Sequence, residues 1–188
     1  MNTPNKLTLL RILLVPVFLL FFLCEWIPLH NVWALLVFAL ASATDAMDGH
    51  IARSRNLVTD FGKFLDPVAD KVLVFAALVA FIGFGWASSV AVIIMIAREF
   101  LVSSLRMVAA DNGTVIAAGK LGKLKTAMTM ASVVVVLVLA AVMDSGLLAE
   151  DFPIGTISNV LVWVSAVMTV ISGIEYLWKN RSQFNSSK

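Results

Sequence analysis

Residues 44–71 read TDAMDGHIARSRNLVTDFGKFLDPVADK, and this stretch decides how the rest of the chain is organised. It contains two aspartate pairs, Asp45/Asp48 and Asp66/Asp70, spaced three and four residues apart, so each pair lies on one face of a helix. Each pair belongs to an otherwise apolar segment that is long enough to enter a bilayer. The short polar run at residues 54–60 predicts a tight turn between two helices, which brings the four carboxylates together.

Ionised aspartates inside a membrane helix cost about 2.5–3.5 kcal/mol each, and neighbouring carboxylates also repel one another. Divalent cations neutralise such a cluster, since Mg²⁺ and Mn²⁺ prefer oxygen ligands. Two ions would balance four aspartates and would suit displacement at a phosphorus atom. The alternative is a set of structural ion pairs between the aspartates and Arg53, Arg55, Lys63 and Lys71.

The composition indicates a membrane protein. Of 188 residues, 60% are hydrophobic, which is too many for a soluble domain of this length, and we expect a single domain over residues 1–188. A polar interfacial segment at residues 1–6 precedes six apolar segments, at about 7–24, 32–53, 62–84, 88–110, 121–143 and 154–178. The expected fold is therefore an all-α integral membrane bundle of six transmembrane helices with an N-terminal interfacial segment. A cleaved signal peptide is disfavoured because no small-residue cleavage site follows the first segment.

The basic residues are unevenly distributed. The expected loops near 25–31, 84–88 and 144–153 contain no lysine or arginine. The positive-inside rule therefore predicts that both termini are cytoplasmic. In this topology the aspartate cluster opens toward the cytoplasm.

Eight residue identities are fixed over 26 positions by the spacing Asp45-x2-Asp48-Gly49-x2-Ala52-Arg53-x8-Gly62-x3-Asp66-x3-Asp70. This pattern resembles the signature of the CDP-alcohol phosphatidyltransferases, with every fixed position present. The phrases TPNKLTLLRILLVP, FLDPVADK, MIAREF and LGKLKT are most similar to members that use glycerol 3-phosphate. The resemblance implies transfer of a phosphatidyl group from CDP-diacylglycerol to glycerol 3-phosphate with release of CMP. It also implies a homodimer in a bacterial inner membrane, with an active site facing the cytoplasm and no nucleic-acid partner.

The resemblance assigns roles to individual residues. Asp45, Asp48 and Asp66 would bind Mg²⁺ or Mn²⁺. Asp70 would lie near the metals and act as the general base, so Asp66 and Asp70 are the expected catalytic residues. The expected CDP and diphosphate contacts are Asp48, Gly49, Ala52, Arg53, Gly62, Asn5, Thr8 and Arg11. The alternatives are interfacial snorkelling for Arg53 and simple capping or anchoring for the N-terminal three.

A separate set of cations lies farther along the chain. Arg98 falls near the middle of its apolar segment and is followed by Glu99. Charges so deep in a membrane normally face a cavity or a polar partner. We expect the phosphate of the acceptor to be bound by Arg98, Arg106, Lys120, Lys123 and Lys125. The alternative is a buried ion network that includes Arg98 and Glu99, with lysines that only orient the chain.

Three other functions remain possible from the sequence. Another family member could use inositol phosphate, serine or phosphatidylglycerol as the acceptor, although the cationic set favours a phosphorylated one. Membrane prenyltransferases also combine aspartate-rich helices with Mg²⁺ and a diphosphate. A divalent-cation transporter would explain the intramembrane carboxylates, although transport needs access from both sides of the membrane.

Overall fold

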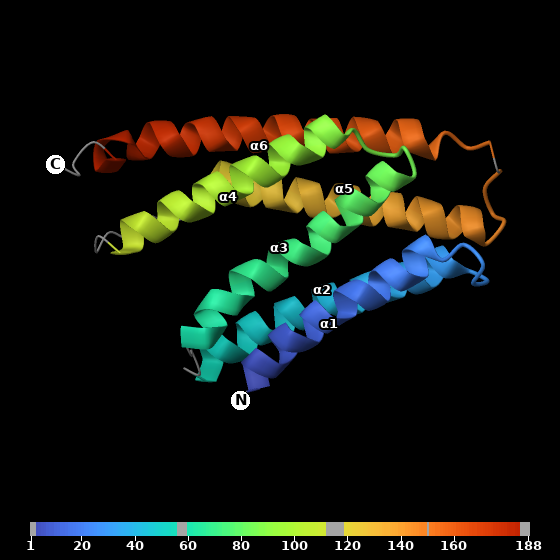
Figure 1. The fold of residues 1–188 in the computed structure, drawn as a ribbon, viewed down its shortest axis with the longest axis horizontal. Coiled ribbons are helices and arrows are strands. Elements are labelled where there is room, and N and C mark those ends of the chain that lie inside the picture. The colour runs from blue at the N-terminus through green and yellow to red at the C-terminus, as the bar shows by residue number, and fades with distance from the viewer. Residues whose placement is uncertain (1–2, 56–59, 112–118, 150, 185–188) are drawn as a thin grey trace. The chain divides into compact units, whose positions relative to one another are not determined.

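The structure, a computed structural model, describes residues 3–55, 60–111, 119–149 and 151–184, with side chains at 7–44, 68–69, 71–110, 119–149 and 151–181. The described chain forms six helices (Figure 1): α1 (Thr3–Leu23), α2 (His30–Arg55), α3 (Asp60–Gly83), α4 (Ser89–Asp111), α5 (Lys120–Asp144) and α6 (Ile154–Phe184). The prediction of an all-α protein with six helices is confirmed.

The first helix differs from the expected segment at its start. α1 begins at Thr3 rather than near Leu7, so residues 3–6 belong to the helix instead of preceding it. Pro4 occupies the first turn, where its missing N–H has no helical partner to lose. The helix also continues through Pro16.

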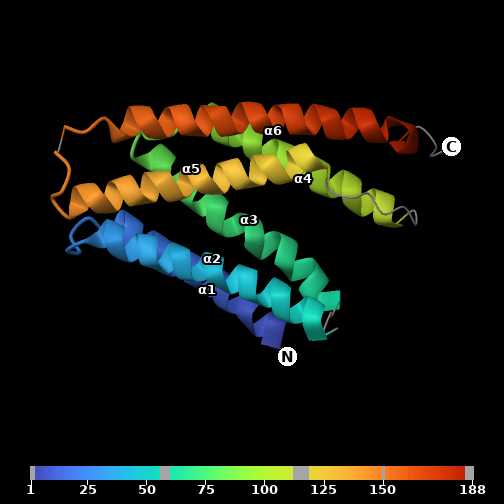
Figure 2. The same cartoon turned by 180° about the vertical axis from the view of Figure 1, so that it is seen from behind.

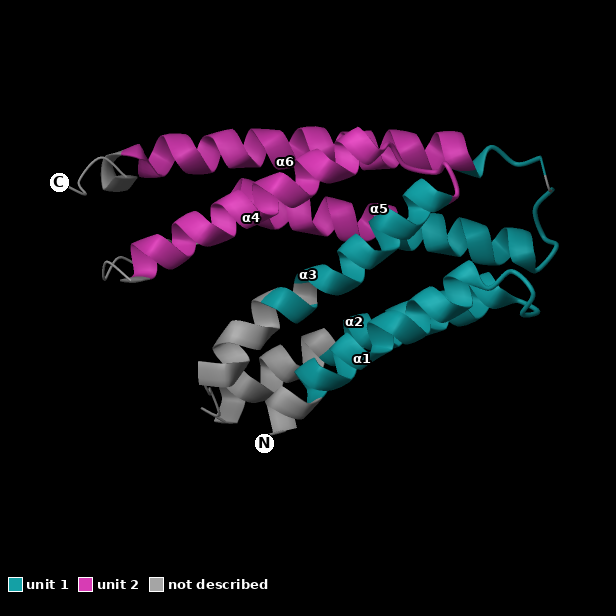
Figure 3. Cartoon of the chain, viewed as in Figure 1, with its two compact units in different colours: residues 1–83, 133–154 teal, residues 84–132, 155–188 magenta. Residues whose placement is uncertain are grey.

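The helices are divided between two compact units (Figure 3). Unit 1 comprises residues 1–83 and 133–154, and unit 2 comprises residues 84–132 and 155–188. Unit 1 therefore holds α1, α2 and α3, whereas unit 2 holds α4 and α6. α5 contributes to both, because its residues up to Ser132 belong to unit 2 and those from Val133 belong to unit 1.

An aromatic cluster joins the three complete helices of unit 1. α1 packs on α2 and α3, and α1 and α2 lie side by side in both views (Figures 1 and 2). Phe18 stacks on Phe22 and meets Phe38 edge-on, with ring centroids 5.7 Å apart in both pairs. Phe22 also contacts Phe81 of α3 at 5.6 Å. Such pairs stabilise a fold by about 0.5–1.5 kcal/mol beyond the burial of their area.

Side chains from distant helices cap two helix starts. In unit 1, Asp144 at the end of α5 accepts a hydrogen bond from the backbone N–H of Asn31 in the first turn of α2, at 2.9 Å. In unit 2, Asn159 of α6 accepts one from the backbone N–H of Ser88, just before α4, at 3.0 Å. N–H groups at a helix start lack a partner within the helix, so these contacts satisfy them and fix where α2 and α4 begin.

Unit 2 buries small polar side chains and exposes large apolar ones. Ser132 of α5 and Ser165 of α6 share a hydrogen bond of 3.0 Å inside the unit. The large apolar residues exposed along α6 are Val160, Trp163, Val164, Val167, Val170, Ile171, Ile174, Leu177 and Trp178. Small polar residues at helix interfaces are typical of membrane proteins, in which lipid covers the apolar outside.

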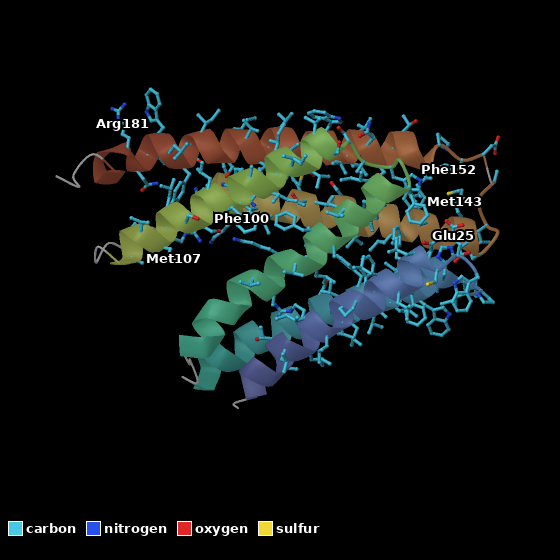
Figure 4. All side chains as sticks on the ribbon, in the orientation of Figure 1. Glu25, Phe100, Met107, Met143, Phe152 and Arg181 are labelled. Carbon is cyan, nitrogen blue, oxygen red and sulfur yellow. The ribbon has the colours of Figure 1, made fainter. Side chains whose placement is uncertain are left out.

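Within the described residues, α5 and α6 are the helices long and apolar enough to cross a membrane. Only 39% of the apolar stretch of α5 and 33% of that of α6 is buried within the chain. Figure 4 shows Phe100 and Met107 on α4, and each is 67% exposed. Apolar surface on this scale is unfavourable in water and is typical of helices surrounded by lipid.

Candidate functional site

The two aspartate pairs lie on consecutive helices that contact one another. Asp45 and Asp48 belong to α2, Asp66 and Asp70 belong to α3, and the two helices pack together. The prediction of two consecutive helices that each carry one aspartate pair is confirmed, whereas the predicted turn includes residues 56–59, which lie outside the described part. The site residues whose side chains lie outside the described part are these four aspartates together with Asn5, Gly49, Ala52, Arg53 and Gly62.

The aspartates occupy matching depths in the hairpin. α2 ends at Arg55, and α3 begins at Asp60. Counted from these ends, Asp48 and Asp66 both lie about 10 Å along their helices at 1.5 Å per residue. Asp45 and Asp70 both lie about 15 Å along. Each aspartate of α2 therefore has a counterpart in α3 at about the same distance from the connection between the two helices.

The aspartates of α2 continue the buried stripe of that helix. Ala34, Phe38 and Ala41 are buried and succeed one another at helical steps of four and three residues. The next two steps along the same stripe reach Asp45 and Asp48. By helical spacing, positions 45 and 48 are in register with the buried stripe of α2.

The aspartates of α3 are placed in the same way. Ala69 and Leu73 are buried in unit 1. Asp66 lies three residues before Ala69, and Asp70 lies three residues before Leu73, so each is one helical turn from a buried position on its own face. Both aspartate pairs therefore lie in register with buried positions of their own helices.

Thr8 and Arg11 are buried at the end of α1 that lies near this level. Thr8 is 0% and Arg11 is 1% exposed, and both residues are engaged in interactions. α1 and α2 run antiparallel, and Phe18 contacts Phe38. Arg11 lies seven residues before Phe18 in α1, and Asp45 lies seven residues after Phe38 in α2. The two residues are therefore expected at the same level. Counting eleven residues back along both helices from the contact between Phe22 and Phe81 pairs Arg11 with Asp70, since α1 and α3 run in the same direction.

A buried guanidinium needs an anionic or polar partner. The interior position of Arg11 agrees with a role inside unit 1. It disagrees with the alternative of a simple interfacial anchor, whose charged group would reach water.

A charged cluster joins the three helices of unit 2. Arg98 of α4 donates from Nη1 to Glu99 Oε1 at 2.7 Å and from Nη2 to Ser172 Oγ of α6 at 2.9 Å. Lys125 of α5 donates to the same Glu99 oxygen. We call these four residues the Arg98 cluster. It contains two cations and one carboxylate, so it keeps a net positive charge.

The Arg98 cluster is relevant to both hypotheses for the five cations, which are phosphate binding and a buried ion network. The ion pair between Arg98 and Glu99 that the alternative foresaw is present, and Lys125 joins it. Arg106, Lys120 and Lys123 are instead exposed on unit 2. The roles of all five cations in phosphate binding stay predictions.

Two residues against Arg98 carry no recognisable signal in the sequence. Ser172 accepts a hydrogen bond from a residue 74 positions away. A Cβ atom on Gly173 would lie 3.1 Å from Arg98 Cγ and 3.4 Å from Arg98 Nε. Serine and glycine in an apolar helix are ordinary packing residues, so only the structure identifies their contact with Arg98.

Other basic residues lie at the C-terminal end of α6, where Figure 4 shows Arg181. Its guanidinium lies 5.0 Å from the ring centroid of Trp178, within the range of a cation–π contact. Lys179 forms an ion pair with Glu175 one turn earlier. These contacts stabilise the helix end and are separate from the Arg98 cluster.

Comparison with known proteins identifies the family. A family model described as CDP-alcohol phosphatidyltransferase matches residues 1–171. A Bacillus subtilis (strain 168) protein named CDP-diacylglycerol--glycerol-3-phosphate 3-phosphatidyltransferase is 41% identical over 201 residues, covering 99% of this chain and 98% of its own. Proteins of the same name from Rickettsia typhi and Yersinia enterocolitica are 36% and 40% identical, covering 97% and 96% of this chain and 99% and 97% of their own. The chain belongs to the CDP-alcohol phosphatidyltransferase family.

Proposed function

We propose that this protein transfers the phosphatidyl group of CDP-diacylglycerol to glycerol 3-phosphate, giving phosphatidylglycerophosphate and CMP. The observation that carries the proposal is the complete eight-residue family pattern on two helices in contact, with its four aspartates in register with buried positions of those helices. The names of relatives that match almost the whole chain support the choice of substrates.

The donor set of the hairpin fits two divalent cations, Mg²⁺ or Mn²⁺. Asp45, Asp48, Asp66 and Asp70 would hold them, because four carboxylates supply the oxygen ligands and the negative charge that such ions require. When bound, the ions would neutralise the diphosphate and make its phosphorus more electrophilic. All other steps of the reaction are assigned to the chain's own residues.

Binding of the nucleotide is assigned to residues around the hairpin. Arg53 would donate hydrogen bonds to the diphosphate. The small residues Gly49, Ala52 and Gly62 would let the nucleotide approach the backbone closely. From α1, Asn5, Thr8 and Arg11 would complete this side of the site. The burial of Thr8 and Arg11 and the level of Arg11 beside Asp45 and Asp70 support that placement.

The chemical step needs a base. The hydroxyl oxygen of glycerol 3-phosphate forms a bond to the phosphorus that carries diacylglycerol, while its proton passes to the carboxylate of Asp70. The bond from the same phosphorus to the CMP oxygen breaks, and CMP leaves with the electron pair. Asp66, one turn before Asp70, would serve the chemical step as one of the carboxylates that hold the cations.

The phosphate of the acceptor is assigned to the cations of unit 2. Arg98 and Lys125 lie in a largely buried cluster with a net positive charge, which suits a doubly charged phosphate better than a neutral alcohol. Arg106, Lys120 and Lys123 would add positive charge at the surface of the same unit.

We also propose that all six helices cross a bacterial inner membrane and that residues 1–188 act as one catalytic domain, functioning as a homodimer. The connections between α1 and α2, α3 and α4, and α5 and α6 contain no lysine or arginine. This supports cytoplasmic termini and an active site that faces the cytoplasm.

The test is CMP release by the purified full-length protein in detergent with CDP-diacylglycerol, Mg²⁺ or Mn²⁺, and one acceptor at a time. We expect release that requires glycerol 3-phosphate and falls at least about 100-fold in Asp66→Asn. Asp144→Asn, which changes the cap at the start of α2, is the matched control and should keep most of the activity.

Each other outcome contradicts a specific part of the proposal. Release with serine, inositol phosphate or phosphatidylglycerol but not glycerol 3-phosphate would refute the acceptor. No release with any acceptor, from folded and metal-loaded protein, would refute the reaction. Flux of Mn²⁺ across vesicles containing such an inactive protein would favour the transporter hypothesis.

A further inference from the structure

We propose that Ser172 and Gly173 of α6 are positioning residues that hold the Arg98 side chain in place for the phosphate of the acceptor. The inference rests on the proposed function, in which Arg98 binds that phosphate. Both residues lie just beyond the part of the chain that the family model matches, residues 1–171.

The contacts fix Arg98 at two levels of its side chain. At the tip, Nη2 donates to Ser172 Oγ at 2.9 Å, and Nη1 donates to Glu99 Oε1 at 2.7 Å. Along the stem, the absence of a Cβ atom at Gly173 makes room for the Cγ and Nε atoms of Arg98. Ser172 and Gly173 are both buried, so water does not compete with their contacts to Arg98. The guanidinium is therefore held in one orientation.

This orientation leaves hydrogen-bonding capacity unused. A guanidinium carries five N–H donors in a planar fork. In the described part of the chain, Arg98 Nε is buried and has no hydrogen-bond partner. Nη1 and Nη2 also keep one N–H each beyond the bonds to Glu99 and Ser172, and a phosphate oxygen would accept from these groups. An arginine already fixed in its bound orientation loses less freedom when the ligand arrives, so the contacts with α6 should raise affinity for the acceptor.

Gly173→Ala tests the role of the glycine. Its Cβ atom would lie 3.1 Å from Arg98 Cγ and would shift the Arg98 side chain by a few tenths of an ångström, away from its hydrogen-bonded orientation. We expect the KM for glycerol 3-phosphate to rise about tenfold, the size of one lost hydrogen bond to a charged group. The kcat and the KM for CDP-diacylglycerol should stay within about twofold of the wild-type values. Ser172→Ala, which creates no clash, should raise the same KM by about threefold.

Gly155→Ala is the matched control on the same helix. Its Cβ atom would meet Trp86 Cδ1 at an ordinary contact distance of 3.5 Å, so no kinetic constant should change. In an Arg98→Ala background, Gly173→Ala should have no further effect on the KM for glycerol 3-phosphate, because the displaced side chain is already gone.

The outcomes separate this inference from the proposed function. Wild-type protein that releases no CMP with glycerol 3-phosphate would overturn both. Active wild type with an unchanged KM in Gly173→Ala, or with an equal rise in the Arg98→Ala background, would overturn the inference alone. If Gly173→Ala fails to fold, Ser172→Ala decides: a KM within the error of the wild type overturns the inference.

Discussion

Replacing Glu99 with glutamine should strongly destabilise the protein. The Glu99 carboxylate is shared by Arg98 and Lys125, and the side chains of the three residues are only 14%, 11% and 10% exposed. Glutamine keeps the shape but removes the negative charge, which leaves two neighbouring cations buried without their shared carboxylate. Removing one partner of a buried ion pair costs about 3–5 kcal/mol. For a chain of this length each kcal/mol lowers Tm by about 2–4 °C, so we expect a fall of about 6–20 °C.

The assay is thermal unfolding of wild type and Glu99→Gln in the same detergent, followed by tryptophan fluorescence. Glu175→Gln is the matched control, because Glu175 also pairs with a lysine, but that lysine, Lys179, is 64% exposed. An exposed pair one helical turn apart contributes about 0.3–0.5 kcal/mol, so the control should move Tm by no more than about 2 °C. A Tm for Glu99→Gln within the range of the control would refute the reasoning about the buried cluster.

Three further predictions test the metals and the packing of each unit. EDTA should abolish CMP release, and excess Mg²⁺ or Mn²⁺ should restore it, because the four carboxylates bind substrate only with their cations; release that persists in EDTA would contradict this. Ser132→Ala should lower Tm by about 2 °C through loss of the hydrogen bond to Ser165, and adding Ser165→Ala should change Tm little further, because the same bond is already lost. Phe22→Ala should cost about 3–5 kcal/mol in the free energy of unfolding, whereas Leu23→Ala, at a position 52% exposed, should cost less than about 1 kcal/mol; equal losses in denaturant titrations would contradict the aromatic core.

The sequence predicts the helices well because the length and position of the apolar runs determine them. Hydropathy predicts the end of a helix less well where that end lies outside the apolar run. α6 continues six residues past Trp178, to Phe184, because the polar residues there include no proline or glycine that would stop it. Hydropathy marks the part of a helix that lies in lipid, whereas backbone hydrogen bonding decides where the helix ends.

The candidate site shows the same division between local and long-range information. Asp45, Asp48, Asp66 and Asp70 can be identified from the sequence because helical spacing places each pair on one face. The ion pair of Arg98 with the adjacent Glu99 is also a local feature. The partners Lys125 and Ser172 come from helices 26 and 74 residues away, and no local pattern encodes such contacts.

The assignment of residues 133–154 to unit 1 has a consequence for biosynthesis. After Gly83 has been made, about 50 more residues must be synthesised before Val133 appears, which takes about 3–10 s at the usual rates of translation. During that interval the three helices of unit 1 are already present, but the second half of α5 is not. The unit that carries the aspartates therefore lacks one of its segments until all of α4 and the first half of α5 have been synthesised.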